Sequence, residues 1–491
     1  MDLFGSALGL VRRRGRLDWS GVATRYLPFA DVATPELPLA QLVRLALFQV
    51  SVGMVGVLTV GTLNRVMIVE MGVGAWLVSL MVALPLLFAP FRALVGFKSD
   101  HHRSALGWRR VPFVWFGSGA MFAGLAIMPF ALVLLTGETT VQQVAGHVAT
   151  GLAFLLAGAG AQTVQTAGLA LATDRATEAT RPRVVALMYV MLLVGMVGSG
   201  LLFGVLLADY TPTRLVQVVQ GTAVVCLALN AVAVWKQEAR NRSRATAPPD
   251  TSRFSQRWAQ FAQHGRVARF LLAVGLGTAA FGMQDIILEP YGGEVLGLSV
   301  GQTTSLTGIM AAGALLAFAW AARQLSRGTC PRRLAAHGLL FGLAAFSLVL
   351  FAEPLGSPLL FRAGVALIGF GGGLFSVGTL SAAMSLDSGG LHGMVLGAWG
   401  GVVATAAGLS VALGGALRDG VGHLAMSGAL GEALMMPATG YAIVYHLELA
   451  LLFATLAVLG PLVTRPRKRH PTRHDSGGTE PRRFGLADFP G

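Results

Sequence analysis

Long apolar runs, separated by short connections that hold most of the charge, dominate this sequence. Only 12% of its 491 residues are charged, against about 25% in soluble domains. A helix of about 20 residues crosses the roughly 30 Å core of a bilayer, and it satisfies its own backbone hydrogen bonds there. The sequence therefore predicts an all-α integral membrane protein of about twelve transmembrane helices. The expected spans are 42–63, 74–97, 111–136, 145–172, 184–208, 215–235, 267–290, 301–322, 334–352, 359–380, 392–415 and 438–463.

The basic residues give these spans a direction. Of the 37 lysines and arginines, 31 lie in the terminal segments and the even-numbered connections, whereas the opposite connections hold Arg65, Arg214 and Arg418. Cytoplasmic loops of membrane proteins carry such an excess, so we expect both termini to be cytoplasmic. The net charge of +14 follows from this placement. It indicates contact with the lipid bilayer rather than nucleic acid, since no aromatic-rich surface lies between the basic clusters.

The longest basic connection divides the chain into two halves of six helices. An offset of 213 residues overlays the fourth helix on the tenth, matching Gly160 with Gly373 and the helix-ending Asp174 with Asp387. Parallel six-helix repeats are the plan of the major facilitator superfamily. The expected parts are an interfacial N-terminal segment (1–40), the first half (41–235), a linker (236–265), the second half (266–463) and a disordered basic tail (464–491).

The connection between the second and third helices resembles the cytoplasmic loop motif of that superfamily. In the motif, an aspartate follows a glycine by four residues, and a second glycine precedes paired basic residues. The resemblance implies a latch between helices, and the alternative is an ordinary positively charged loop. Here the second glycine comes later than usual. The residues concerned are Gly96, Asp100, Arg103, Gly107, Arg109 and Arg110.

The seventh helix carries two acids at membrane depth, where ionisable groups are functional candidates. Asp285 and Glu289 are four residues apart and share a helix face. Arg65 follows the first helix on the side of the membrane where the seventh helix ends, so it is a candidate partner for either acid. An ion pair between them would close the outer end of a central cavity. The alternative is that these groups lie in interfacial water. Asn64 and Gln284 complete this group of candidates, and Pro290 is expected to end the helix.

Several segments carry a resemblance to the PucC/LhaA family of photosynthetic bacteria. The most telling is Gly282-Met-Gln-Asp-Ile-Ile-Leu-Glu-Pro-Tyr-Gly-Gly293 at the end of the seventh helix. Further segments are 48–54, 61–70, 84–97, 99–112, 181–190 and 396–400, so the resemblance covers about residues 25 to 465. It implies a major-facilitator-type protein of the bacterial inner membrane, cytoplasmic or intracytoplasmic, that assembles light-harvesting complexes.

The resemblance also implies cargo and partners. The expected cargo is bacteriochlorophyll, delivered to the light-harvesting alpha and beta polypeptides, with pigment-synthesis enzymes as further partners and the core antenna favoured slightly over the peripheral one. We find no Walker loop, nucleophile elbow or zinc motif, so we expect neither an enzyme nor a metal site. The alternative function is proton-coupled transport of a small solute through Asp285 or Glu289.

Three histidines are candidates for ligands of the pigment magnesium, because neutral imidazole binds metals through one ring nitrogen. His446 lies within the twelfth expected helix, His337 near the start of the ninth and His147 near the start of the fourth. The alternative is that each histidine makes an ordinary helix contact.

The predicted orientation can be measured with reporter fusions. Green fluorescent protein fused after Gly491 should fluoresce, whereas the same protein inserted after Ala429, in the connection before the twelfth helix, should stay dark because exported copies fold poorly. Alkaline phosphatase at the two positions should give the opposite pattern. Fluorescence at both positions would contradict a twelve-helix arrangement with cytoplasmic ends.

Overall fold

The computed structural model describes residues 38–87, 108, 110–176, 180–238, 265–384 and 392–462, and every regular element within them is a helix. The first half contains α3 (Leu39–Leu45), α4 (Leu47–Gly56), the π-helical η2 (Val57–Leu63) and η3 (Val66–Glu70), α5 (Ala75–Leu87), α7 (Val111–Leu135), α8 (Thr140–Arg175), α9 (Arg181–Leu206) and α10 (Pro212–Val234). The second half contains α12 (Gly265–Gly282), α13 (Gln284–Glu294), α14 (Val300–Ser326), α15 (Pro331–Ala352), α16 (Pro358–Met384), α17 (His392–Met426), η4 (Glu432–Leu434), α18 (Ala438–Leu459) and η5 (Gly460–Leu462).

Among the described residues, eleven helical segments are long and apolar enough to cross a membrane. The first of them, Leu39–Glu70, joins α3, α4, η2 and η3, and the sixth joins α12 to α13. A shorter apolar helix, α5, takes the place of the second predicted span and reaches the edge of the described residues at Leu87. These elements confirm the predicted all-α membrane fold with about twelve helices.

The helix boundaries follow local chemistry that an apolar run does not reveal. Capping boxes start α8 at Thr139 and α14 at Ser299, where the side chain and the glutamine three residues on satisfy backbone N–H groups reciprocally. The eleventh helix was predicted to end at residue 415 but continues to Met426. Arg418 and Asp419 lie inside it because their charges are paired with one another.

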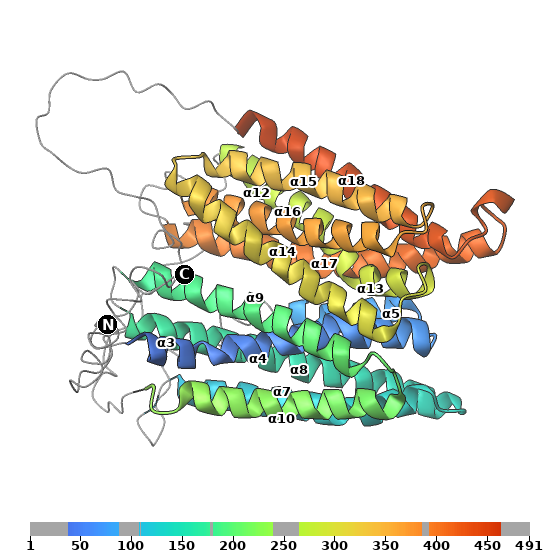
Figure 1. Ribbon diagram of the computed structural model, residues 1–491, viewed down its shortest axis with the longest axis horizontal. Coiled ribbons are helices and arrows are strands. Elements are labelled where there is room, and N and C mark those ends of the chain that lie inside the picture. Colours follow the sequence, from blue (N-terminus) through green and yellow to red (C-terminus); the bar gives the residue numbers. More distant parts are fainter. Residues whose placement is uncertain are drawn as a thin grey trace, which may run out of the picture.

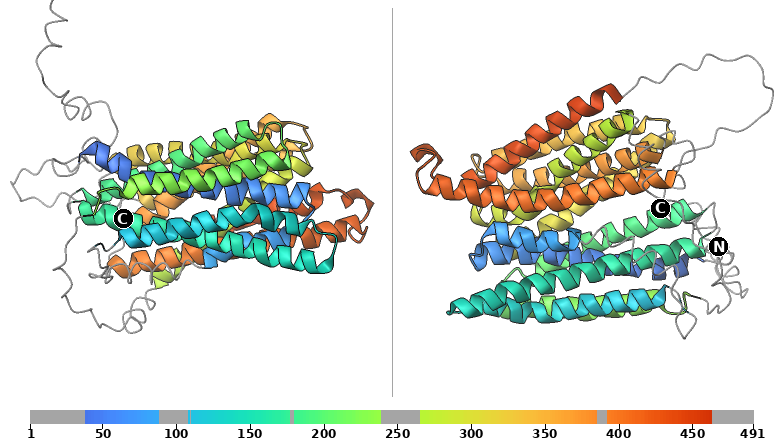
Figure 2. Two further views of the ribbon diagram at one scale, coloured as in Figure 1. Left: turned by 90° about the horizontal axis from the view of Figure 1, so that it is seen from below. Right: turned by 180° about the vertical axis from the view of Figure 1, so that it is seen from behind.

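The two halves lie side by side, with the first half in blue to green and the second in yellow to red (Figure 1; Figure 2 gives two further views). Each half contains the same closely packed helix pair, α7 with α8 in the first and α15 with α16 in the second. The described residues thus have the 6+6 arrangement of the major facilitator superfamily.

The helix contacts correct the predicted register of the repeat. A β-carbon on Gly160 of α8 would lie 2.6 Å from the carbonyl oxygen of Gly117 on α7, and one on Gly371 of α16 would lie 2.8 Å from that of Gly338 on α15. The equivalent glycines are therefore Gly160 and Gly371, an offset of 211 residues rather than 213. The sequence alone does not distinguish the two offsets, because both helices contain glycines two residues apart. Gly160 therefore matches a glycine at an offset of 211 residues and also at an offset of 213.

The contacts between the halves lie mainly at one end of the bundle, near residues 61–79. The predicted orientation places this end on the outer side of the membrane, and we call it the outer end. There α9 packs on α14 and α5 packs on α17. A β-carbon on Gly200 of α9 would lie 2.7 Å from the Cα of Gly308 on α14, and one on Gly415 of α17 would lie 2.6 Å from the carbonyl oxygen of Ala75 on α5. Small residues allow this approach, since lipid provides no hydrophobic drive between helices.

Replacing Gly200 with a larger residue should push α9 and α14 apart. We expect Gly200→Val to destabilise the protein by about 1–3 kcal/mol, because the added methyl groups meet backbone that cannot move aside. Gly198→Val is the matched control, since a β-carbon there, on the same helix, meets nothing within 4 Å. Thermal unfolding in detergent should show a lower melting temperature for the first variant only. Equal melting temperatures would contradict the proposed role of the glycine contact.

Candidate functional site at the junction of the halves

The seventh membrane span is divided at Met283, between α12 and α13. The prediction that Pro290 ends this helix is wrong, since α13 continues through it to Glu294. A proline has no N–H, so it cannot donate to the carbonyl four residues earlier. Here that carbonyl belongs to Ile286, and the span survives only if another donor reaches it.

Asn64 of the first half supplies that donor. Its Nδ2 donates to the carbonyl oxygen of Ile286 across a distance of 2.8 Å, and both residues are buried. Nearby, Thr62 donates to Thr304 on α14 at 3.3 Å. The end of the first helix is thus hydrogen-bonded to the second half at the position where the seventh helix lacks its own bond.

A buried acid of the last helix accepts a hydrogen bond at the start of α13, where the seventh span is divided. Glu448 on α18 is fully buried, and its Oε1 accepts a hydrogen bond from the backbone N–H of Gln284 at 2.6 Å. This N–H opens α13, and a carboxylate at a helix N-terminus is favoured by the helix dipole. The side-chain amide of Gln284 donates to Asp285. The sequence analysis did not single out Glu448, although a lone acid within the last apolar run was a signal for it.

Arg65 forms its ion pair with Glu70 rather than with Asp285 or Glu289, which corrects the predicted partner. The two residues are five apart in the chain, and the π-helical stretch η3, with its i to i+5 hydrogen bonds, brings such positions together. Arg65 still reaches the second half, where its NH2 group donates to the carbonyl oxygen of Leu298 at 3.3 Å.

Glu289 lies at the same junction but is held by a neutral group. The hydroxyl of Thr307 donates to its Oε1, and its other oxygen has no partner. Gly61 of the first half leaves room for it, since a β-carbon there would collide with this carboxyl group. The structure therefore brings Asn64, Gln284 and Glu289 together around α13, with Arg65 nearer the outer end.

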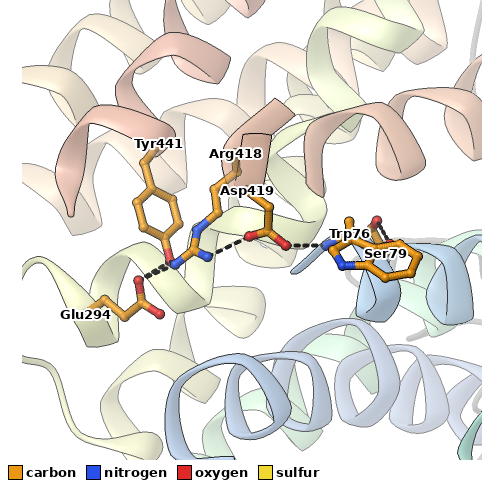
Figure 3. A network of polar contacts seen from close by, with 6 residues as sticks. All are labelled: Trp76, Ser79, Glu294, Arg418, Asp419 and Tyr441. Carbon is orange, nitrogen blue, oxygen red and sulfur yellow. Dashed lines mark hydrogen bonds and ion pairs between the residues drawn. The ribbon is translucent and has the colours of Figure 1, made fainter. Parts of the chain in front are cut away.

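A second polar network closes the outer end, and Figure 3 shows it. Arg418 on α17 pairs with Glu294 and with Asp419, and its NH2 group lies 2.8 Å from the hydroxyl of Tyr441. Asp419 in turn accepts a hydrogen bond of 2.8 Å from the backbone N–H of Trp76 on α5. The network joins α13, α17 and α18 to the first half. The sequence shows Arg418 only as a charge beside Asp419, because its other two partners are 124 and 23 residues away.

At the opposite, inner end, the structure describes only Arg110 from the predicted loop motif. Its Nε lies 3.1 Å from Asp174 at the end of α8. Glu238, which follows α10, accepts hydrogen bonds from the backbone N–H groups of Arg110 and Val111 at the start of α7. Arg110 thus joins α7 to α8 within the first half. Gly96, Asp100, Arg103, Gly107 and Arg109 lie outside the described residues.

The described residues form a cavity and a groove that could admit ligands. A cavity of ≈ 190 Å³ lies beside Asp285, between α12, α16 and α17. A larger groove of ≈ 550 Å³ opens between α9 and α10, lined mainly by apolar side chains, with Gly221 in its wall. No group of three metal-ligating side chains occurs in the part of the chain that the structure describes.

The three candidate histidines lie on three different helices. His446 is exposed on α18, and its Nδ1 lies 2.7 Å from the carbonyl oxygen of Ala442, one turn earlier. His337 is exposed on α15 beside the ring of Trp320. His147 is partly buried on α8.

The fold and the polar junction between its halves define a multi-pass membrane protein of the major facilitator type. A mutant form of the nucleoside transporter NupG has a similar fold, with a TM-score of 0.65 at 13% identity over 85% of this chain and 99% of that protein. The PUCC protein family matches residues 62–467. The chain belongs to this family.

Curated relatives agree with the family match. A Rhodobacter capsulatus protein described as an uncharacterized protein in the puhA-bchM intergenic region is 53% identical over 96% of this chain and 98% of its own length. Protein PucC of Rhodovulum sulfidophilum is 52% identical over 82% of this chain and 89% of its own length. A protein named bacteriochlorophyll synthase 44.5 kDa chain, also from Rhodobacter capsulatus, is 28% identical over 88% of this chain and 97% of its own length.

A double-mutant cycle tests the hydrogen bond between Asn64 and Ile286. Asn64→Leu should cost about 1–3 kcal/mol of unfolding free energy, because the Ile286 carbonyl is left unsatisfied. In a Pro290→Ala background the new N–H can satisfy that carbonyl within the helix, so the cost should fall by at least about 0.5 kcal/mol. Denaturant unfolding of the four proteins in detergent measures both values. An identical cost in the two backgrounds would show that Asn64 acts in another way.

Proposed function

We propose that this protein is a non-enzymatic assembly factor of a bacterial photosynthetic membrane. It holds bacteriochlorophyll and hands it to the light-harvesting alpha and beta polypeptides. Membership of the PUCC protein family supports this role, and the printed name of the relative called bacteriochlorophyll synthase 44.5 kDa chain supports a link to the pigment. The core antenna is our favoured client, and a strain without the protein should then lose core antenna absorbance before pigment synthesis is affected.

The proposal that the protein binds pigment rests on the exposed His446. It is the ninth residue of α18, so it lies about 12 Å along the helix, well inside a bilayer core of about 30 Å. Ionisable residues at this depth almost always face the protein interior or a water-filled cavity. A histidine on the outer surface of the bundle therefore calls for a partner in the membrane.

The imidazole of His446 is arranged as in metal-binding histidines. The carbonyl oxygen of Ala442 accepts a hydrogen bond from the Nδ1–H group, which leaves the lone pair of Nε2 available in the neutral ring. In most histidines that bind metals, a carbonyl or carboxylate that accepts from the other ring nitrogen orients the imidazole in this way. The ligand bound through Nε2 would be the magnesium ion of the pigment.

The surface around His446 suits a flat apolar molecule. Ile443 and Phe453, on the same face of α18, are 45% and 62% exposed, and Ala450 between them is small. Pigment held there can pass sideways to a neighbouring transmembrane polypeptide without crossing water. The cavity beside Asp285 is a poorer fit for a tetrapyrrole, since its ≈ 190 Å³ is below the roughly 300 Å³ at which pockets for drug-sized ligands begin.

Removing the His446 imidazole should remove the pigment. We expect His446→Leu, purified from its native membrane, to carry at least about tenfold less bacteriochlorophyll per protein than the unaltered chain. His337→Leu is the matched control for an exposed histidine, and Gly221→Phe, which fills the groove between α9 and α10, controls for pigment bound there. Absorption spectra of the three variants measure the pigment. Full retention by His446→Leu would sink the proposed site.

Proton-coupled transport of a small solute is the second candidate function. Glu289 and Glu448 are buried and form no ion pair among the described residues. The charge of Arg65 still acts on Glu289, whereas no cation of the described chain acts on Glu448, and uncompensated buried charges are costly. A transporter should take up its solute in pigment-free liposomes, and Glu289→Gln should abolish this uptake. A pigment-free preparation that still transports would favour this candidate over the assembly factor.

A further inference from the structure

The cavity beside Asp285 combines one acid with aromatic walls. It lies beside the break between α12 and α13, facing α16 and α17, and its lining residues include Thr278, Phe281, Asp285, Phe375, Thr379 and Trp399. Asp285 is the one ionisable side chain in this lining. The cavity thus has a single acidic side chain, located at membrane depth.

Asp285 has no cation of its own among the residues that the structure describes. The side-chain amide of its neighbour Gln284 donates to one carboxylate oxygen, and none of the ion pairs of the described chain includes Asp285. A carboxylate inside a membrane protein is stabilised by a charged partner. The cavity leaves room for that partner to come from outside the chain.

The aromatic walls favour a particular kind of cation. The rings of Phe281 and Phe375 are 6.0 Å apart between centroids and tilted by 38°. The indole N–H of Trp399 lies 3.3 Å from the hydroxyl of Thr379, which fixes the orientation of the ring. Aromatic faces attract organic ammonium ions, and aromatic cages bind quaternary ammonium groups in this way. A strongly hydrated metal ion would gain less from such walls.

We infer that this cavity binds a small organic ammonium ion, with its charge beside Asp285 and its alkyl groups against the aromatic rings. The volume of ≈ 190 Å³ admits a molecule of a few heavy atoms, and the hydroxyls of Thr278 and Ser376 offer hydrogen bonds to a polar substituent. This site is separate from the lipid-facing His446 and does not depend on the pigment-handling role.

Choline and its uncharged isostere 3,3-dimethylbutan-1-ol provide the direct test. The two molecules have the same shape and differ by the positive charge. Calorimetry or thermal-shift titration of the full-length protein in detergent should show choline binding at least about tenfold more tightly than the alcohol, since the carboxylate interacts with the charge. No choline binding, or equal affinities for both molecules, would overturn the inference.

Two variants separate the roles of the acid and the rings. Asp285→Asn should bring the choline and alcohol affinities together, whereas Trp399→Leu should weaken choline binding by about two- to thirtyfold. Phe370→Leu, an aromatic change on α16 outside the cavity lining, should leave choline binding unchanged. Retained discrimination by a folded Asp285→Asn variant would place the cation elsewhere. Antenna absorbance and pigment content report separately on the proposed function, so the failure of one leaves the other standing.

Discussion

A carbonyl group without a hydrogen-bond donor costs several kcal/mol inside a membrane, and one such group lies at the junction of the two halves. Pro290 deprives the Ile286 carbonyl of its helical donor, and Asn64 from the other half replaces it. The seventh helix therefore keeps its path only while the first helix lies against it. The unpaired carbonyl of Ile286 is thus satisfied by a hydrogen bond that joins the two halves of the protein.

The other contacts near this bond also depend on the close approach of the two halves. Gly200, Gly308 and Gly415 let the halves meet at the outer end, where Arg418 and Asp419 tie α17 to α5 through the backbone of Trp76. Toward the inner end, the cavity beside Asp285 lies within the second half. His446, which is exposed on α18, lies outside both sites, so an interior ligand and a membrane-borne pigment would use separate surfaces.

Sequence reasoning located the candidate residues better than their partners. It selected Asn64, Arg65, Gln284 and Glu289, and all four lie around the junction. It paired Arg65 with the wrong acid, because a π-helical stretch cannot be read from an apolar run and the partner, Glu70, depends on it. Glu448 was missed because its role is to accept the N–H at a helix break 164 residues away. Pro290 predicts a helix end from the sequence alone, since the donor that lets the helix continue comes from another part of the chain.

The sequence by itself determined the helical membrane fold, the division into halves and the family resemblance, because apolar length, charge placement and local motifs are properties of neighbouring residues. The offset between the repeats, the closure of the outer end and the isolation of Asp285 from any described cation were decided only by the tertiary structure. Each depends on which groups from distant segments come within hydrogen-bonding or contact distance. In lipid, where an unpaired buried polar group is costly, the choice of partner distinguishes a structural residue from a candidate binding site.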